Sequence, residues 1–129
     1  MSIKVYTATS PAKLLLVDDH PMIRRGIADL LGFENNISVV AEANHGEEAL
    51  AYLANHSVDL IVLDNNMPVM NGLETLKKIR EREIEGKVLL FTVSDNSKDV
   101  QDALQLGVDG YLLKDARRAE LVRAVLRAR

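Results

Sequence analysis

The chain has 129 residues, a formal net charge of −3 and a hydrophobic fraction of 47%. This length suits one compact domain that buries about two thirds of its unfolded surface. The weak acidic balance argues against direct nucleic-acid binding, and the absence of cysteine excludes disulfides and thiolate metal sites. We find neither a signal-peptide core nor an apolar run near the roughly 20 residues of a membrane span, so we expect a cytoplasmic protein without membrane contact.

Residues 1–12 lack a periodic pattern and are predicted to form a loose N-terminal arm before a single domain, residues 13–129. Five short runs in that domain are almost continuously apolar and rich in Val, Ile and Leu, which is typical of strands buried on both faces. These predicted strands cover residues 13–17, 37–42, 60–64, 87–92 and 110–113.

Apolar residues at helical spacing lie between and after these runs. The five sets are Ile23, Ile27, Leu30 and Leu31; Ala49, Leu50, Leu53 and Ala54; Leu73, Leu76 and Ile79; Val100, Ala103, Leu104 and Gly107; and Leu121, Val122, Val125 and Leu126. Pro21 suits the first position of the first helix, and Asn71 or Gly72 the start of the third.

Alternating strands and helices predict an α/β fold with a doubly wound parallel sheet, covered by helices on both faces. The flavodoxin-like (βα)5 arrangement, with strand order 2-1-3-4-5, fits this pattern. In that arrangement ligands bind at the carboxyl ends of strands 1 and 3.

Polar residues follow four of the predicted strands, at the edge where the carboxyl ends of parallel strands meet. They are Asp18 and Asp19 after the first strand, Asp64 at the end of the third, Thr92 and Ser94 at the fourth, and Lys114 after the fifth. Three neighbouring carboxylates repel one another, and a divalent cation relieves that repulsion. Oxygen-only ligands favour Mg²⁺ over a dedicated Ca²⁺ cage.

Asp64 is then placed to act as a nucleophile that accepts a phosphoryl group and forms an aspartyl phosphate. The charge on the phosphoryl oxygens needs a cation and hydrogen-bond donors close by. Mg²⁺, the Lys114 ammonium, the Thr92 hydroxyl and backbone N–H groups after Asp64 are the predicted sources.

Several of these residues also have a simpler structural interpretation. Asp18 and Asp19 are suited to capping the helix after them, and Thr92 is an ordinary β-branched strand residue. Lys114 and Asp115 form a possible loop ion pair. The three histidines, His20, His45 and His56, are not predicted to form a metal site.

The motifs "LLLVDDHP", "LIVLDNNMPVMNGLETL", "VLLFTVSD" and "GVDGYLLKD" together resemble the receiver domain of bacterial two-component response regulators. The match begins near Lys13 and extends to the end of the chain. The sequences of these motifs are similar to those of the NarL/FixJ (LuxR-type) subfamily, in particular to those of nitrate/nitrite response regulators.

This resemblance implies a role for each matching residue. Asp64 would be the phosphoacceptor and Asp19 a direct Mg²⁺ ligand, with Asp18 acting through water and Asn66 contributing its backbone carbonyl. In the same way, Thr92 would move onto the phosphoryl group, Lys114 would pair with it, Tyr111 would track the switch, and the Asn66 and Ser94 side chains would influence phosphoryl lifetime.

One residue departs from the family pattern. The position after the phosphoacceptor is commonly apolar, and this chain has Asn65 there. A polar side chain at that position is either less buried than usual or needs a hydrogen-bond partner of its own.

The resemblance also implies partners: a sensor histidine kinase as phosphodonor, and a second receiver bound through the surface of the fourth helix, fifth strand and fifth helix. Related regulators continue into a helix-turn-helix domain, so we expect DNA contact only through an output domain outside this chain. Such a protein is not an enzyme, although it catalyses its own Mg²⁺-dependent phosphorylation and dephosphorylation.

The alternatives are a pseudo-receiver that binds partners without being phosphorylated, and a stand-alone receiver. A flavin carrier on the same fold would need a phosphate-binding loop rich in Gly, Ser and Thr after the first strand. A phosphatase of the haloacid dehalogenase type would need a D-x-D pattern there, where this chain has Asp18-Asp19.

Overall fold

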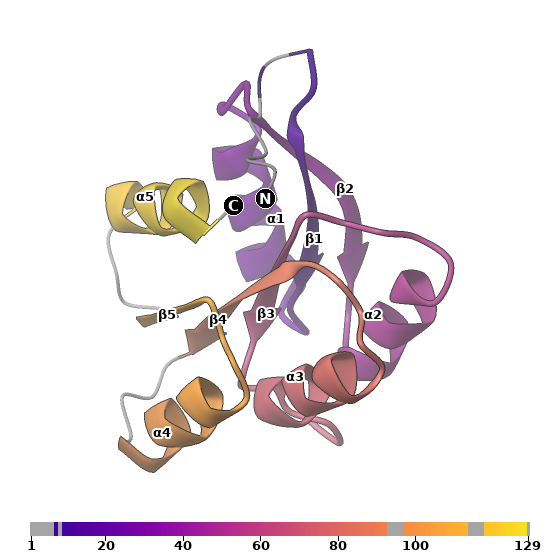
Figure 1. Cartoon of the computed structure of the whole chain (residues 1–129). Coiled ribbons are helices and arrows are strands. Elements are labelled where there is room, and N and C mark those ends of the chain that lie inside the picture. The colour runs from indigo at the N-terminus through magenta and orange to yellow at the C-terminus, as the bar shows by residue number, and fades with distance from the viewer. Residues whose placement is uncertain (1–6, 8, 93–96, 114–117, 129) are drawn as a thin grey trace.

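The five predicted strands and five predicted helices are all present in the computed structural model, which describes residues 7, 9–92, 97–113 and 118–128 (Figure 1). The strands are β1 (Ala12–Val17), β2 (Ile37–Ala43), β3 (Leu60–Asp64), β4 (Lys87–Thr92) and β5 (Gly110–Leu113). The helices are α1 (Pro21–Leu31), α2 (Gly46–Leu53), α3 (Gly72–Glu81), α4 (Ser97–Gln105) and α5 (Arg118–Ala128). Ala12, the last residue of the predicted arm, begins β1.

All neighbouring strands pair in parallel, and their order is β2-β1-β3-β4-β5. The predicted fold class and strand order are therefore confirmed. Because β1 and β3 are neighbours, the residues that follow them meet at one edge of the sheet. Adjacent pairs such as Val17 and Leu63 set this register.

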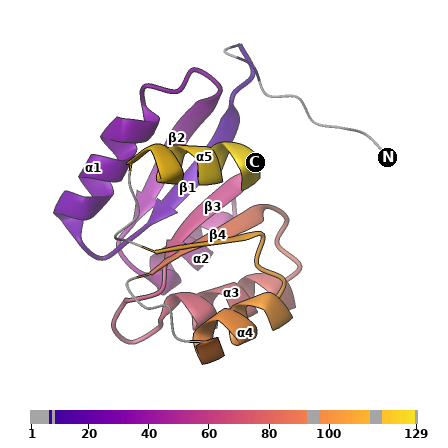
Figure 2. The ribbon, with the colours of Figure 1, turned by 90° about the vertical axis from the view of Figure 1, so that its left-hand side faces the viewer.

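Side chains of the central strands alternate between two apolar cores, one on each face of the sheet. Leu15 and Val17 point to the core under α2, α3 and α4, whereas Leu14 and Leu16 point to the core under α1 and α5. Figure 2 shows α1 and α5 on one side of the strands and α3 and α4 on the other. Both faces are thus covered, which explains why the strand sequences are continuously apolar.

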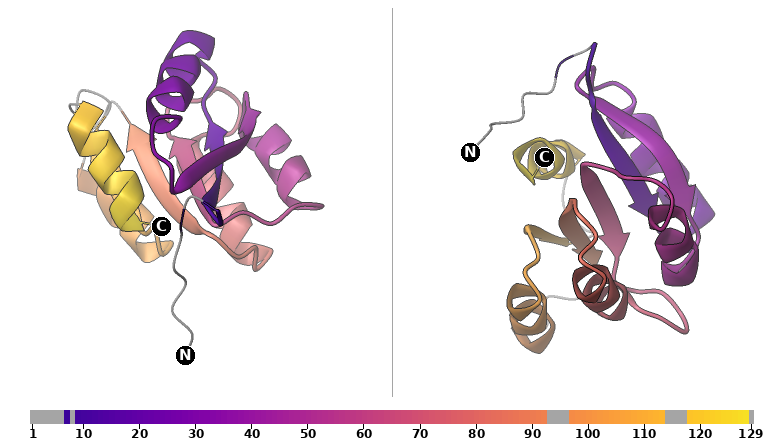
Figure 3. Two further views of the ribbon diagram at one scale, coloured as in Figure 1. Left: turned by 90° about the horizontal axis from the view of Figure 1, so that it is seen from above. Right: turned by 45° about the vertical axis from the view of Figure 1, so that its right-hand side comes forward.

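The helices are also spread along the sheet. Figure 3 shows α4 and α5 near one edge and α2 near the other, in agreement with the contacts of α5 with β4 and β5 and of α2 with β2. The carboxyl ends of the central strands are left between these helices.

Four residues of the predicted apolar helix faces are exposed and do not lie in the core: Ile23, Ala54, Leu104 and Gly107. Ala54 lies directly after the last residue of α2. Ile23 is 41% exposed, because it is in the first turn of α1, beside the carboxyl edge of the sheet rather than over it. Leu104 is 65% exposed, since one residue after the buried Ala103 a helix has turned by about 100°. Gly107 lies beyond the end of α4, with a φ of 76° that favours glycine.

Candidate phosphoacceptor and metal site

The acidic pair after β1 is held in a tight turn at the carboxyl edge of the sheet. The backbone N–H of Asp18 donates to the carbonyl of Ala43 at 3.1 Å. The Asp18 Oδ1 atom accepts a hydrogen bond from the backbone N–H of His20 at 2.8 Å. Pro21 then begins α1. Asp18 is almost completely buried, whereas the Asp19 side chain is 25% exposed.

Asp64 is the last residue of β3, and its carboxylate is also buried. Its Oδ1 atom accepts a hydrogen bond from the backbone N–H of Asn66 at 2.9 Å. Gly72 begins α3 directly against this strand end: a Cβ atom on Gly72 would lie 2.6 Å from the Asp64 carbonyl oxygen and 2.7 Å from Asn65 Cα. Glycine is therefore required for α3 to approach Asp64 so closely.

Asn65, the departure from the family pattern, is buried and has a hydrogen-bond partner. Its Oδ1 atom accepts from the backbone N–H of Leu73 at 3.0 Å, in the first turn of α3. Asn71 and Glu74 form a capping box at the same helix end. The Asn65 and Asn71 side chains accept from the N–H groups of Leu73 and Glu74, which have no partner within the helix. Asn65 thus joins the end of β3 to the start of α3.

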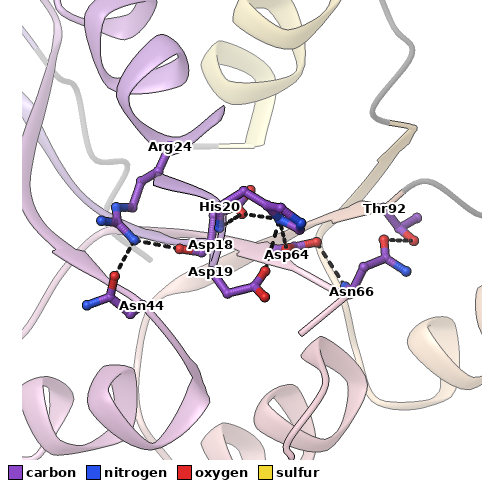
Figure 4. A network of polar contacts seen from close by, with 8 residues as sticks. All are labelled: Asp18, Asp19, His20, Arg24, Asn44, Asp64, Asn66 and Thr92. Carbon is purple, nitrogen blue, oxygen red and sulfur yellow. Dashed lines mark hydrogen bonds and ion pairs between the residues drawn. The ribbon is translucent and has the colours of Figure 1, made fainter. Parts of the chain in front are cut away.

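The carboxylates of Asp18, Asp19 and Asp64 meet at one place, as the parallel topology predicts (Figure 4). One ligand atom from each of them, and one from His20, all lie within 4.8 Å of one another. Hard oxygen ligands at this separation fit a divalent cation. The cluster can therefore bind a metal ion.

His20 also belongs to this cluster, although the three histidines were not predicted to form a metal site. Its Nδ1 atom lies 3.1 Å from Asp18 Oδ1, 3.0 Å from Asp19 Oδ1 and 3.8 Å from Asp64 Oδ2. The Nδ1 atom of His20 is therefore within hydrogen-bonding distance of Asp18 Oδ1 and lies close to the carboxylate of Asp19. The adjacency of His20 to the acidic pair was the available signal; the direction of its side chain was not predictable.

Thr92 ends β4 next to Asp64 and is fully buried. Its hydroxyl group donates to the Oδ1 atom of Asn66 at 3.1 Å, so the predicted switch residue contacts the loop that follows the predicted phosphoacceptor (Figure 4). Tyr111 is half-buried on β5 and packs against the core under α4. The other two predicted residues, Ser94 and Lys114, lie outside the described residues.

A shallow depression of about 160 Å³ lies beside the site, between the start of α2 and the loop after β3. It is lined by His45, Gly46, Glu47, Pro68, Val69 and Met70. Its walls are mainly apolar, and none of the predicted catalytic residues lines it.

A doubly wound sheet with a buried aspartate at its switch point, two further acids beside it and a buried threonine on the next strand is the arrangement of a receiver domain. The chain belongs to the response regulator receiver domain family, which matches residues 14–126. The resemblance inferred from the motifs is therefore confirmed.

Individual relatives support this assignment. The chain is 48% identical over 118 residues to the nitrate/nitrite response regulator protein NarL of Escherichia coli K12, covering 92% of this chain and 55% of that protein. The chain thus spans about half the length of the curated relatives it matches.

Solved structures of LuxR-family regulators have the same fold. A two-component response regulator from Aurantimonas sp. SI85-9A1 superposes with a TM-score of 0.85 at 34% identity, covering 91% of this chain and 84% of that one. A DNA-binding response regulator from Staphylococcus aureus gives a TM-score of 0.84 at 26% identity, with 91% and 98% covered. Among the described residues, no helix is long and apolar enough to cross a membrane.

Proposed function

We propose that this chain is a phosphorylation-dependent signalling switch that accepts a phosphoryl group on Asp64 from a sensor histidine kinase. The observation that carries the proposal is the position of Asp64, buried at the end of β3 with its ligand atom within 4.8 Å of those of Asp18 and Asp19. The Asp64 carboxylate is buried, is oriented by the hydrogen bond from the Asn66 N–H, and lies close to the proposed cation ligands Asp18 and Asp19. The family to which the chain belongs supports the same role.

The chemistry is a phosphoryl transfer. An Asp64 carboxylate oxygen attacks the phosphorus of a phosphohistidine; a P–O bond forms as the P–N bond breaks. The electron pair of the broken bond remains on the imidazole nitrogen, which takes up a proton from water. Water later hydrolyses the acyl phosphate, which releases inorganic phosphate and returns Asp64 to its carboxylate form.

Mg²⁺ is the proposed cofactor, and when bound it neutralises charge on the phosphoryl oxygens. Asp18, Asp19 and Asp64 would hold it together with the backbone carbonyl of Asn66, and the all-oxygen carboxylate set fits this hard cation. Thr92 donates a hydrogen bond to the phosphoryl group and Lys114 pairs with its charge. The chain catalyses only its own phosphorylation and dephosphorylation and is not otherwise an enzyme.

The output is proposed to be transcriptional. The related protein from Staphylococcus aureus is a DNA-binding response regulator, and the chain covers about half of NarL. DNA contact would therefore come from an output domain outside this chain. The proposed location of the protein is the cytoplasm. The surface of α4, β5 and α5 is the proposed site of pairing with a second receiver.

The test is incubation of the chain with Mg²⁺ and acetyl phosphate, followed by intact mass spectrometry. We expect one added phosphoryl group that hydroxylamine removes, because hydroxylamine cleaves acyl phosphates. Asp64→Asn should remain unlabelled, since its amide cannot form the acyl phosphate, whereas the exposed control Asp29→Asn should be labelled like the wild type. Labelling of Asp64→Asn would place the phosphoacceptor elsewhere, and an unlabelled wild type would favour a pseudo-receiver.

A further inference from the structure

Arg24, in the first turn of α1, joins three separate segments beside the acidic cluster. Figure 4 shows two of these contacts, those with Asp18 and Asn44. Its Nη1 atom donates to the backbone carbonyl of Asp18 at 2.7 Å and to Asn44 Oδ1 at 2.6 Å. Its Nε atom donates to Glu42 Oε1 at 3.0 Å. The side chain is only 16% exposed, although it carries a charge. The guanidinium therefore connects the end of β1, the end of β2 and the loop before α2.

The contact with the Asp18 carbonyl acts on both acidic residues of the turn. That carbonyl belongs to the peptide group that links Asp18 to Asp19, so its direction fixes how the two carboxylates are presented. The peptide group on the N-terminal side of Asp18 is already held, because the Asp18 N–H donates to the carbonyl of Ala43. With Arg24 in place, rotation of the Asp18–Asp19 peptide would break a short charge-assisted hydrogen bond.

Arg24 is itself held in position by its other partners. Glu42 supplies a carboxylate on β2, and Asn44 donates in turn to Glu48 Oε2 on α2 at 3.1 Å. A planar guanidinium presents donors in several fixed directions at once, which a lysine ammonium on a flexible chain does not reproduce. The arrangement therefore requires arginine rather than any cation.

We propose that Arg24 is a positioning residue for metal binding, which holds the Asp18–Asp19 peptide so that both carboxylates face Asp64. The inference rests on the proposed function, because it concerns the Mg²⁺ site of the same cluster. Arg24 touches neither the metal nor the phosphoryl group; it acts through the backbone that carries two of the ligands.

The experiment compares Arg24→Ala and Arg24→Lys with Arg25→Ala in the full chain. Arg25 is a matched control, since it is the next residue of α1 and is 77% exposed, with an ion pair to Asp29 at 3.7 Å. Mg²⁺ binding is measured by isothermal titration calorimetry, and stability by urea unfolding in EDTA. Glu42→Gln is added as a variant that weakens the anchor of Arg24 but keeps its contact with Asp18.

We expect Arg24→Ala to weaken Mg²⁺ binding by about tenfold or more, the usual effect of removing a group that orients metal ligands. Arg24→Lys and Glu42→Gln should show smaller losses, and Arg25→Ala none. The rate of phosphorylation of Arg24→Ala by acetyl phosphate should recover when Mg²⁺ is raised, because the phosphoacceptor itself is intact.

Two outcomes would overturn the inference in distinguishable ways. If the wild type binds Mg²⁺ and the Arg24 variants bind it equally well while losing stability, Arg24 supports only the fold, and the proposed function stands. If the wild type does not bind Mg²⁺ at all, the proposed function and the inference both fail. Should Arg24→Ala not fold, Arg24→Lys and Glu42→Gln decide between these outcomes.

Discussion

Replacing Asp19 by asparagine should stabilise the metal-free protein while removing its response to Mg²⁺. The substitution keeps the shape of the side chain and deletes one of the three negative charges in the cluster. The ligand atoms of Asp18, Asp19 and Asp64 lie within 4.8 Å of one another. At an effective dielectric constant of about 20, each of the two repulsions that Asp19 makes at that distance is about 3.5 kcal/mol.

The net gain is smaller than these repulsions for two reasons. The Asp19 side chain is 25% exposed, so water already screens part of the repulsion, and the side chains can move apart when no metal is bound. We therefore expect Asp19→Asn to raise the free energy of unfolding in EDTA by about 1–3 kcal/mol. Mg²⁺ at about 100 times its dissociation constant should add about 2.7 kcal/mol to the free energy of unfolding of the wild type. In excess Mg²⁺ the wild type should therefore be about as stable as Asp19→Asn.

The assay is urea unfolding followed by far-ultraviolet circular dichroism, because the chain has no tryptophan to report by fluorescence. Each protein is unfolded in EDTA and in excess Mg²⁺, with the exposed Asp29→Asn as control. Asp19→Asn should also fail to accept a phosphoryl group from acetyl phosphate. A variant that is less stable than the wild type without metal, and is phosphorylated normally, would refute the shared metal site.

Two further predictions concern the residues around Asp64. Gly72→Ala should lower the free energy of unfolding by about 1–3 kcal/mol and slow phosphorylation by acetyl phosphate, since the added Cβ atom would lie 2.6 Å from the Asp64 carbonyl oxygen. Gly26→Ala is the control and should not destabilise the protein, because a Cβ atom there would have nothing within 4 Å. Beryllofluoride, which mimics the phosphoryl group, should change amide exchange mainly in residues 92–115, and less in Thr92→Ala. An exchange response confined to residues 20–60 would contradict a switch through Thr92 and Tyr111.

Much of the fold was predictable because its strands are buried on both faces. Only a short, continuously apolar run satisfies that environment, so the strand limits agree with the prediction to within one residue. The convergence of Asp18, Asp19 and Asp64 then follows from topology, since parallel strands end at one edge. Neither step requires knowledge of how any side chain is oriented.

The contacts that depend on register and side-chain direction were not predictable. Arg24 reaches Glu42 and Asn44 because β2 pairs with β1 in one register, which shifts between Leu14 and Leu15. No sequence pattern specifies such a shift. Asn65 left two possibilities open, and only the position of α3 decides that its amide is buried and hydrogen-bonded to the helix.

The two halves of the site are held in different ways, and this difference suits a switch. On the metal side, Arg24 fixes the peptide between the acids and Asn65 ties the end of β3 to α3. On the β4 side, the Thr92 hydroxyl donates to Asn66, a residue of the loop beside the phosphoacceptor. A phosphoryl oxygen on Asp64 is a charged acceptor and so competes with the neutral amide oxygen of Asn66 for that hydroxyl. In the proposed switch, the side that would bind the cation can therefore stay rigid while the Thr92 hydrogen bond changes partner. Only this change of partner would need to differ between the two proposed signalling states.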